Sequence, residues 1–270
     1  MESPRTTDLP SGRAKLTRVL RAAKDTVHID DAVAVLNIGR TEASKLLSRW
    51  TQQGWLKRVG PGVYVPVSLD ALENQHVLDD PWVLVPALYS PAYIGGWSAA
   101  EHWDLTEQIF RDLVVLTAQQ VRVRHQDVHG ASLFLRHIRE DKIFGTKSLW
   151  RGRTRVAVSD VHRTIVDMLD DPVIGGGIQH VADCFHAYVK RPDCDPEELI
   201  SYADRLGNGA VFKRLGFLAE QTPGGKTIAE RSRARLTKGN AKLDSALKCP
   251  RLVTRWRLWV PQSWSEGRVL

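Results

Sequence analysis

The chain has 270 residues, 43% of them hydrophobic and 26% charged, and a formal net charge of +7. This is the composition of an ordinary globular protein, and the length suits one large domain or two smaller ones. The longest apolar run, residues 82–97, is interrupted by prolines and glycines, which excludes a membrane span. Three cysteines without a Cys-x-x-Cys pair indicate a reduced, cytoplasmic protein.

The charge is unevenly distributed along the chain. Residues 1–70 hold 11 basic and 7 acidic residues, residues 71–220 hold 16 and 21, and residues 221–270 hold 11 and 3. This asymmetry predicts one basic surface for phosphate backbones and a different surface for another partner.

The N-terminal part predicts a small helical domain after a disordered lead-in, residues 1–13. We expect a helix over 14–24, a short strand over 27–29, a helix over 31–36 and a second helix over 41–53. Thr41 is the expected N-cap of the last helix, and Gly54 follows its end. Ala43, Leu46, Leu47 and Trp50 recur at helical spacing and predict its buried face.

Two short apolar runs, 55–59 and 63–65, flank a Gly-Pro-Gly turn and predict a hairpin. With the two helices this pattern predicts a winged helix-turn-helix over residues 14–70, a fold that binds DNA. The alternative is a winged domain used only for protein contacts. The residues expected to meet bases or phosphates lie on the second helix and on the hairpin: Arg40, Thr41, Glu42, Ser44, Lys45, Ser48, Arg49, Lys57, Arg58 and Gly62.

Beyond a polar connector, residues 67–80, the sequence predicts a larger mixed α/β domain, so that the whole chain is α+β. Ser98 and Glu101 form an expected capping box for a short helix. Strands are expected over 113–117, 121–124, 133–138 and 155–158, in a mixed or antiparallel sheet, with turns at 126–127, 129–130 and 151–152.

The remainder of the chain is predicted to be mainly helical. One helix is expected from Ser159 until the Asp171-Pro172 stop, one after the glycines 175–177, and one opened by Asp195 as N-cap with Pro196 after it. A break is expected at 222–225 and a final strand over 255–260. The segment 221–270 forms a basic tail, which extends the DNA surface, meets RNA or an acidic partner, or is simply a solvated helix face. Its candidate contact residues are Arg231, Arg233, Arg235, Lys238 and Lys242.

Four patterns suggest chemistry, and each has a simpler explanation. Gly95-Gly96 before Asp112 is weakly similar to a nucleotidyltransferase loop, but Val114 stands where the second metal-binding carboxylate should be. Glu140 and Lys142, with Asp112 or Asp127, fit part of a nuclease site, although a charged turn explains them as well.

Glycines 175–177 precede a helix and fit an anion cradle, but they lack the lysine and hydroxyl of a phosphate-binding loop. His125, His129 and His137 have no ligand set around them that would complete a zinc site. We therefore expect no enzymatic activity, no metal and no cofactor.

Four sets of residues, in this order, resemble the AbiEi family, the antitoxins of type IV toxin–antitoxin systems first named from phage abortive infection. They are the N-terminal winged pattern, Gly95–Ala100 with His102 and Leu105–Gln108, Val158–Asp167 with Asp171-Pro172 and Gly175-Gly176, and Lys213–Leu218. His162 departs from the family pattern, where an acidic residue is more usual.

The resemblance implies an antitoxin and transcriptional autorepressor. Such proteins bind inverted repeats of double-stranded operator DNA, usually cooperatively, so self-association on DNA is expected. Their C-terminal domain, here residues 71–270, neutralises a cognate nucleotidyltransferase toxin without a stable complex. Two alternatives remain: a ligand-sensing winged-helix regulator without a toxin, and a DNA-targeted nuclease. The recognition helix is only modestly basic, so we expect help from the tail or from a second copy of the chain.

Overall fold

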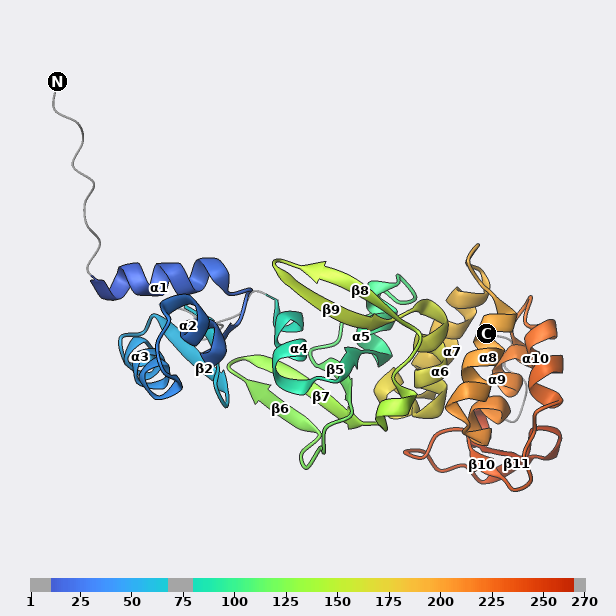
Figure 1. Ribbon diagram of the computed structural model, residues 1–270. Helices are drawn as coiled ribbons and strands as arrows, with labels where there is room; N and C mark the ends of the chain where they lie inside the picture. The colour runs from blue at the N-terminus through green and yellow to red at the C-terminus, as the bar shows by residue number, and fades with distance from the viewer. Residues whose placement is uncertain (1–10, 68–79, 265–270) are drawn as a thin grey trace. The chain divides into compact units, whose positions relative to one another are not determined.

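The computed structural model describes residues 11–67 and 80–264 of the chain (Figure 1). The expected domain boundary near residue 70, residues 1–10 of the lead-in and most of the connector lie outside these residues. The chain divides into two compact units. The first comprises residues 1–89, 127–131 and 150–156, and the second comprises residues 90–126, 132–149 and 157–270.

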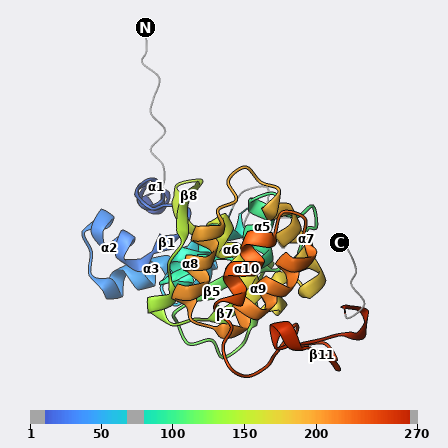
Figure 2. The same ribbon diagram turned by 90° about the vertical axis from the view of Figure 1, so that its right-hand side faces the viewer.

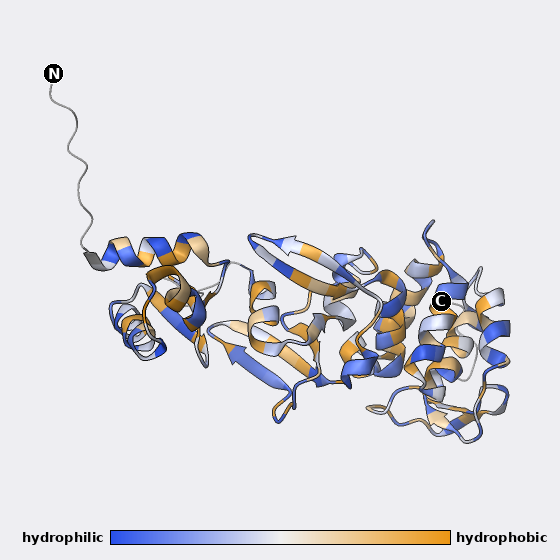
Figure 3. Cartoon of the chain, viewed as in Figure 1, coloured by the Kyte–Doolittle hydropathy of each residue, from blue (hydrophilic) through white to orange (hydrophobic). Residues whose placement is uncertain are grey.

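The first unit combines helices with a small sheet. Its elements are α1 (Ser11–Ala22), β1 (Val27–His28), α2 (Ile29–Leu36), α3 (Arg40–Gln52), β2 (Leu56–Gly60), β3 (Val63–Pro66), η2 (Pro81–Val83) and α4 (Leu84–Tyr89). The sheet has the order β1-β3-β2 and is antiparallel throughout. Polar and apolar residues alternate along α1 (Figure 3), and its Leu16 and Val19 are buried. They join Trp50 and Tyr64 in one core, so a single apolar cluster holds the helices on the sheet.

A six-stranded sheet has the order β6-β7-β5-β4-β9-β8. Its strands are β4 (Ala92–Ile94), β5 (Leu113–Thr117), β6 (His125–Val128), β7 (Ala131–His137), β8 (Thr146–Arg151) and β9 (Thr154–Ser159). Strand β5 runs antiparallel to β4 and parallel to β7, so the expected mixed sheet is confirmed. Tyr93, Val114 and Phe134 pack together on it with Trp97 of α5 (Gly96–His102).

Helices cluster at the C-terminal end of the second unit (Figure 2). They are α6 (Val161–Asp170), α7 (Ile178–Val189), α8 (Pro196–Leu206), α9 (Gly209–Gln221) and α10 (Lys226–Arg233), with the 3-10 turns η3 (Glu140–Lys142) and η4 (Pro172–Gly175) before α6 and α7. A three-stranded sheet, η5 (Thr254–Trp256) and η6 (Gln262–Trp264) complete the unit; the strands are β10 (Ala241–Lys242), β11 (Arg251–Val253) and β12 (Leu258–Val260). The predicted stop after α6 and the Asp195 cap of α8 are both confirmed.

Three predicted helix starts need correction. Helix α1 begins three residues earlier than expected. Helix α3 begins at Arg40 with Gly39 as N-cap, so Thr41 lies inside the first turn and does not cap it. Helix α5 begins at Gly96, and Ser98 lies inside that helix, where its hydroxyl accepts a hydrogen bond from the backbone N–H of Val114 at 2.9 Å. A hydroxyl taken by a neighbouring strand cannot cap its own helix.

Two predicted strands also need correction. Residues 121–124 are not a strand, and β6 lies over His125–Val128, where a turn was expected. Val123 is 59% exposed, so its alternation with arginines reflects no buried face. Of the predicted final strand 255–260, only residues 258–260 are extended, because Arg257 has a φ of 51° and breaks the strand. Strands β4, β8, β10 and β11 were not predicted.

Candidate nucleic-acid interface

Helix α3 is held by a core that leaves one polar face outside. Ala43, Leu47 and Trp50 are at most 1% exposed, and Leu46 packs beside them partly buried, so the predicted buried face is confirmed. The preceding helix, α2, ends at Leu36, and its C-cap Asn37 has a φ of 53°, which reverses the chain before α3 starts. The exposed positions of α3 include these predicted contact residues: Arg40, Thr41, Glu42, Lys45, Ser48 and Arg49; Ser44 is half-buried.

The charge on this face is smaller than a count of basic residues suggests. Arg40 forms an ion pair with Asp30 of α2, and both side chains are largely exposed. Lys45 and Arg49 have no ion-pair partner among residues 11–67 and 80–264. An exposed ion pair contributes little to stability and can be exchanged for a phosphate contact. Lys45 and Arg49 are therefore the cations of α3 most directly available to an anion.

The β2–β3 hairpin is anchored within its own unit. The carbonyl oxygen of Arg58 accepts a hydrogen bond from His129 Nε2 at 2.7 Å, and the Arg58 guanidinium donates to the carbonyl of Gly60 at 3.2 Å. Gly60 approaches the Leu88 side chain so closely that a Cβ would lie 2.5 Å from it. Of the hairpin residues predicted to meet DNA, Arg58 is exposed, whereas Lys57 and Gly62 are half-buried. His129 lies 71 residues away in sequence, and no local pattern pointed to its role.

The tail residues lie in the second unit, and part of their charge is used there. Arg231 of α10 pairs with Glu197, and Arg235, which follows α10, pairs with Asp204, both at 2.8 Å, so both arginines contact α8. Arg233, Lys238 and Lys242 are exposed. Two of the five candidate cations of the tail thus serve the packing of helices.

Most of the residues that suggested enzymatic chemistry make internal contacts. The carboxylate of Asp112 lies 3.2 Å from His125, and Lys142 Nζ donates to the carbonyl of Arg205 at 2.7 Å. Asp141, between Glu140 and Lys142, pairs with Arg139. Asp127 accepts from the backbone N–H of Gly130 and shapes a turn. Within the described part of the chain, no three His, Cys, Asp or Glu side chains are grouped as metal ligands.

The glycine run 175–177 does not present an open anion site. Gly177 is the N-cap of α7, and the N–H of Ile178 donates to the carboxylate of Asp244 at 3.1 Å. The helix N-terminus is therefore satisfied by an acidic side chain of the same unit.

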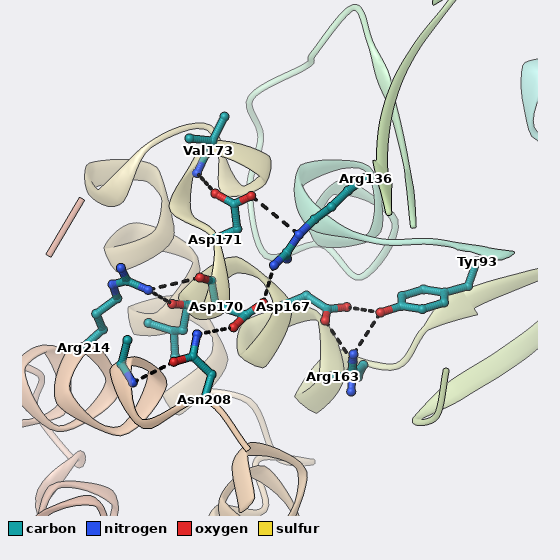
Figure 4. A network of polar contacts seen from close by, with 11 residues as sticks. Tyr93, Arg136, Arg163, Asp167, Asp170, Asp171, Val173, Asn208 and Arg214 are labelled. Carbon is teal, nitrogen blue, oxygen red and sulfur yellow. Dashed lines mark hydrogen bonds and ion pairs between the residues drawn. The ribbon is translucent and has the colours of Figure 1, made fainter. Parts of the chain in front are cut away.

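The motif residues of the second unit converge on a buried polar network around α6 (Figure 4). Arg163 and Asp167, one turn apart on α6, have side-chain exposures of 0% and 1%, and Arg163 Nε lies 2.9 Å from Asp167 Oδ1. Tyr93 of β4 donates its hydroxyl to Asp167 at 2.9 Å and accepts from Arg163 at 3.0 Å. The Arg163 guanidinium also lies 4.0 Å from the centre of the Phe144 ring.

The same network continues beyond this triad. Arg136 of β7 pairs with Asp170 and Asp171 at the end of α6 (Figure 4). Arg214 of α9 donates to the carbonyls of Leu169 and Asp170 at 2.7 and 3.1 Å. These contacts join the sheet, α6 and α9. The motif on α6 therefore holds the sheet and α9 in place. Sequence spacing alone does not reveal this structural role.

Burial dominates the electrostatics of this network. It raises the pKa of Tyr93 well above its usual value, so the hydroxyl stays protonated and donates. Burial also raises the pKa of Asp167, although the guanidinium of Arg163 opposes that rise. His162 is the residue that departs from the family pattern, and its Nδ1 lies 2.8 Å from the hydroxyl oxygen of Tyr188. It takes a position in the buried packing of α6 against α7.

Residues 15–67 match the family model described as "Transcriptional regulator, AbiEi antitoxin". No curated protein matches the chain. Among solved structures, the chain is similar to the crystal structure of the RV2827C protein from Mycobacterium tuberculosis. The TM-score is 0.63 at 14% identity, with 96% of this chain and 94% of that chain covered, so the two share a fold.

None of the described helices is long and apolar enough to cross a membrane. The resemblance to the AbiEi family is confirmed over the segment that contains most of α1 together with α2, α3 and the β2–β3 hairpin. Over residues 15–67 the chain is therefore similar to the AbiEi antitoxin transcriptional regulators.

Proposed function

We propose that the protein is an antitoxin and transcriptional autorepressor of a type IV toxin–antitoxin operon. In this proposal residues 11–67 bind inverted repeats in the promoter, and the rest of the chain neutralises a nucleotidyltransferase toxin encoded beside it. The observation that carries the proposal is the family match over residues 15–67, the same segment that displays the polar face of α3.

The arrangement of α2, the Asn37 turn, α3 and the β2–β3 hairpin supports a winged helix-turn-helix. In that fold the N-terminal half of the second helix meets base edges in the major groove, which assigns readout to Thr41, Ser44 and Lys45. Arg49 and Arg58 then contact phosphates. Because α3 carries few free cations, two copies of the chain occupy an inverted repeat together.

Neutralisation is assigned to the second unit, acting by contact or competition rather than by catalysis. What supports this is the internal use of residues that suggested chemistry: Lys142 is bonded to a backbone carbonyl, Asp112 lies against His125, and Asp127 accepts from a backbone N–H. The protein works in the cytoplasm, where its promoter and its toxin are.

DNA binding is tested by fluorescence anisotropy on a labelled duplex of the chain's own promoter. Lys45→Ala with Arg49→Ala should weaken binding at least tenfold, since a lost base contact costs about 1–3 kcal/mol and a lost phosphate contact adds to it. Arg124→Gln, an exposed arginine of the second unit, is the matched control and should bind as the wild type does. Unchanged affinity of the double variant would show that α3 is not the recognition helix.

Neutralisation is tested by co-expressing the full chain with the neighbouring toxin candidate. The Lys45→Ala/Arg49→Ala variant should still restore growth, because repression and neutralisation reside in different units. Loss of rescue in a folded variant would tie neutralisation to the N-terminal domain.

A ligand-sensing regulator is the second candidate, favoured by a cavity of about 310 Å³ in the second unit. It is lined by Ala219, Glu220, Thr222, Gly224, Lys226, Ala229, Glu230, Arg233 and Trp256, from α9, α10 and the segments beside them. The neighbouring gene discriminates the two: without a nucleotidyltransferase beside this gene, the sensor proposal takes precedence.

A further inference from the structure

The turn of the β8–β9 hairpin is locked onto the end of α1 within the first unit. Asp25 accepts hydrogen bonds at one carboxylate oxygen from the N–H of Arg153 at 2.8 Å and from the hydroxyl of Thr154 at 2.6 Å. Gly152 has a φ of +56°, and a Cβ there would lie 2.7 Å from Asp25. The turn therefore requires glycine at this position, both for its conformation and for its approach to Asp25.

The Arg153 side chain closes the same contact from the other side. Its guanidinium donates to the carbonyls of Leu20 and Arg21 at 3.2 and 2.7 Å. These carbonyls belong to the C-terminal end of α1, where the helix dipole favours a cation. Arg151 is also engaged: it lies 4.3 Å over the Trp82 ring and 3.8 Å from Asp80. Two arginines of the hairpin thus fix its position in the unit.

The remaining side chains of the turn point to solvent. Trp150 is 69% exposed, and Arg155 is exposed as well. A two-residue turn at 152–153 places positions 150 and 155 opposite each other on neighbouring strands, so the two side chains share a face. Arg21 and Lys24 are exposed at the end of α1 to which the turn is bonded. We call Trp150, Arg155, Arg21 and Lys24 the hairpin surface.

The hairpin surface is strongly positive for its size. None of its three cations has an ion-pair partner within residues 11–67 and 80–264, and the nearby Asp25 accepts its two hydrogen bonds from the turn at one carboxylate oxygen. In the described part of the first unit there are 13 Lys or Arg and 6 Asp or Glu, and the hairpin supplies three of the 13. A large exposed aromatic ring opposite the unpaired Arg155, with two further cations exposed at the end of α1, is typical of surfaces that bind nucleic acids.

We propose that the hairpin surface is a second DNA contact of the first unit, which binds the phosphate backbone. Arg155, Arg21 and Lys24 contact phosphates, and Trp150 packs on the sugar–phosphate chain. This inference rests on the proposed DNA-binding function. It identifies a source of additional affinity for DNA. Phosphate contacts carry no sequence information, so the surface strengthens binding to promoter and unrelated DNA alike.

The test is the salt dependence of binding by the full-length protein, measured by fluorescence anisotropy on promoter and scrambled duplexes. Arg155→Gln should weaken binding to both by about three- to tenfold and lower the slope of log K against log salt by about 0.9. Trp150→Ala should weaken both equally, with little change in slope. Arg124→Gln is the control and should change neither quantity. Circular dichroism checks that each variant is folded.

The outcomes separate this inference from the function it rests on. If the wild type does not bind the promoter, the proposed function fails. Suppose that the wild type binds the promoter and that this binding depends on Lys45. If Arg155→Gln and Trp150→Ala then keep the affinity and the salt slope of the wild type, the hairpin surface is not a DNA contact. Intact DNA binding by Trp150→Ala together with lost toxin neutralisation would instead make it a protein interface, and would also overturn the inference.

Discussion

At the scale of single residues, the buried pair of Arg163 and Asp167 bears most on whether the second unit folds. Both side chains are almost fully inaccessible, and Tyr93 bridges them. Such a pair gains little over apolar packing, but losing one partner leaves a charge buried without compensation. We infer that this triad fixes how β4 meets α6.

Replacing Asp167 with alanine tests this role. We expect the free energy of unfolding to fall by about 3–5 kcal/mol, measured by urea titration, because Arg163 loses its counter-charge. Asp141→Ala is the matched control: it removes an equally close pair with Arg139, but one with exposures of 70% and 62%. That change should cost less than about 1 kcal/mol. Equal losses in the two variants would contradict a special role for the buried pair.

At the scale of elements, α8 shows how a local signal decides a helix start. Its N-cap Asp195 accepts hydrogen bonds from the N–H groups of Glu197 and Glu198 at 2.8 and 3.2 Å, as the Asp-Pro-Glu-Glu pattern predicted. These bonds hold the pKa of Asp195 below its ordinary value of 3.8, and the bond from Glu198 contributes most to the lowering. A cap whose folded pKa is lowered stabilises the helix only when it is ionised.

The cap therefore predicts a pH dependence. Its contribution is present above the ordinary carboxyl pKa and is lost as the pH falls from there through the lowered pKa of Asp195. Asp195→Asn keeps a capping oxygen but does not titrate, so it should flatten this part of the stability curve. The measurement is urea unfolding at several pH values between about 5 and 2.5, with wild type and variant compared. Parallel curves would show that Asp195 does not contribute to acid sensitivity.

At the scale of the whole molecule, the first unit is discontinuous in sequence. It includes residues 127–131 and 150–156, which follow its main segment by some tens of residues. Through them His129 bonds the hairpin strand β2, and Arg153 bonds the end of α1. Cutting the chain after the N-terminal domain therefore removes contacts of that domain itself.

This discontinuity predicts that a fragment of residues 1–89 is less stable than the same segment in the full chain. Peptides from α1 should exchange their amide hydrogens faster in the fragment, as followed by mass spectrometry. Asp25→Asn should speed exchange in the full chain but have no effect in the fragment, where Arg153 and Thr154 are missing. Identical exchange of fragment and full chain would show that the two later segments add nothing.

Elements that depend on interactions between residues close in sequence were predicted well, and elements that depend on distant residues were not. The buried face of α3 and the stop of α6 at Asp171-Pro172 were predicted because helical period and capping act over a few residues. Strand β6 was misplaced and β8 was missed, because a strand exists only where a partner strand pairs with it. The motif around α6 was recognised, but its role as a scaffold joining Tyr93, Arg136 and Arg214 was not predictable from spacing.

For the candidate site, local patterns determined which residues of α3 are exposed and that two helices and a hairpin adjoin in the chain. The AbiEi resemblance rested on the same local patterns. Only the tertiary structure decided that Arg40 is paired, that the β2–β3 hairpin is anchored by His129, and that Trp150 and Arg155 belong to the first unit. Asp25 and Arg153 are 128 residues apart in sequence, and only the folded chain brings such groups within hydrogen-bond distance.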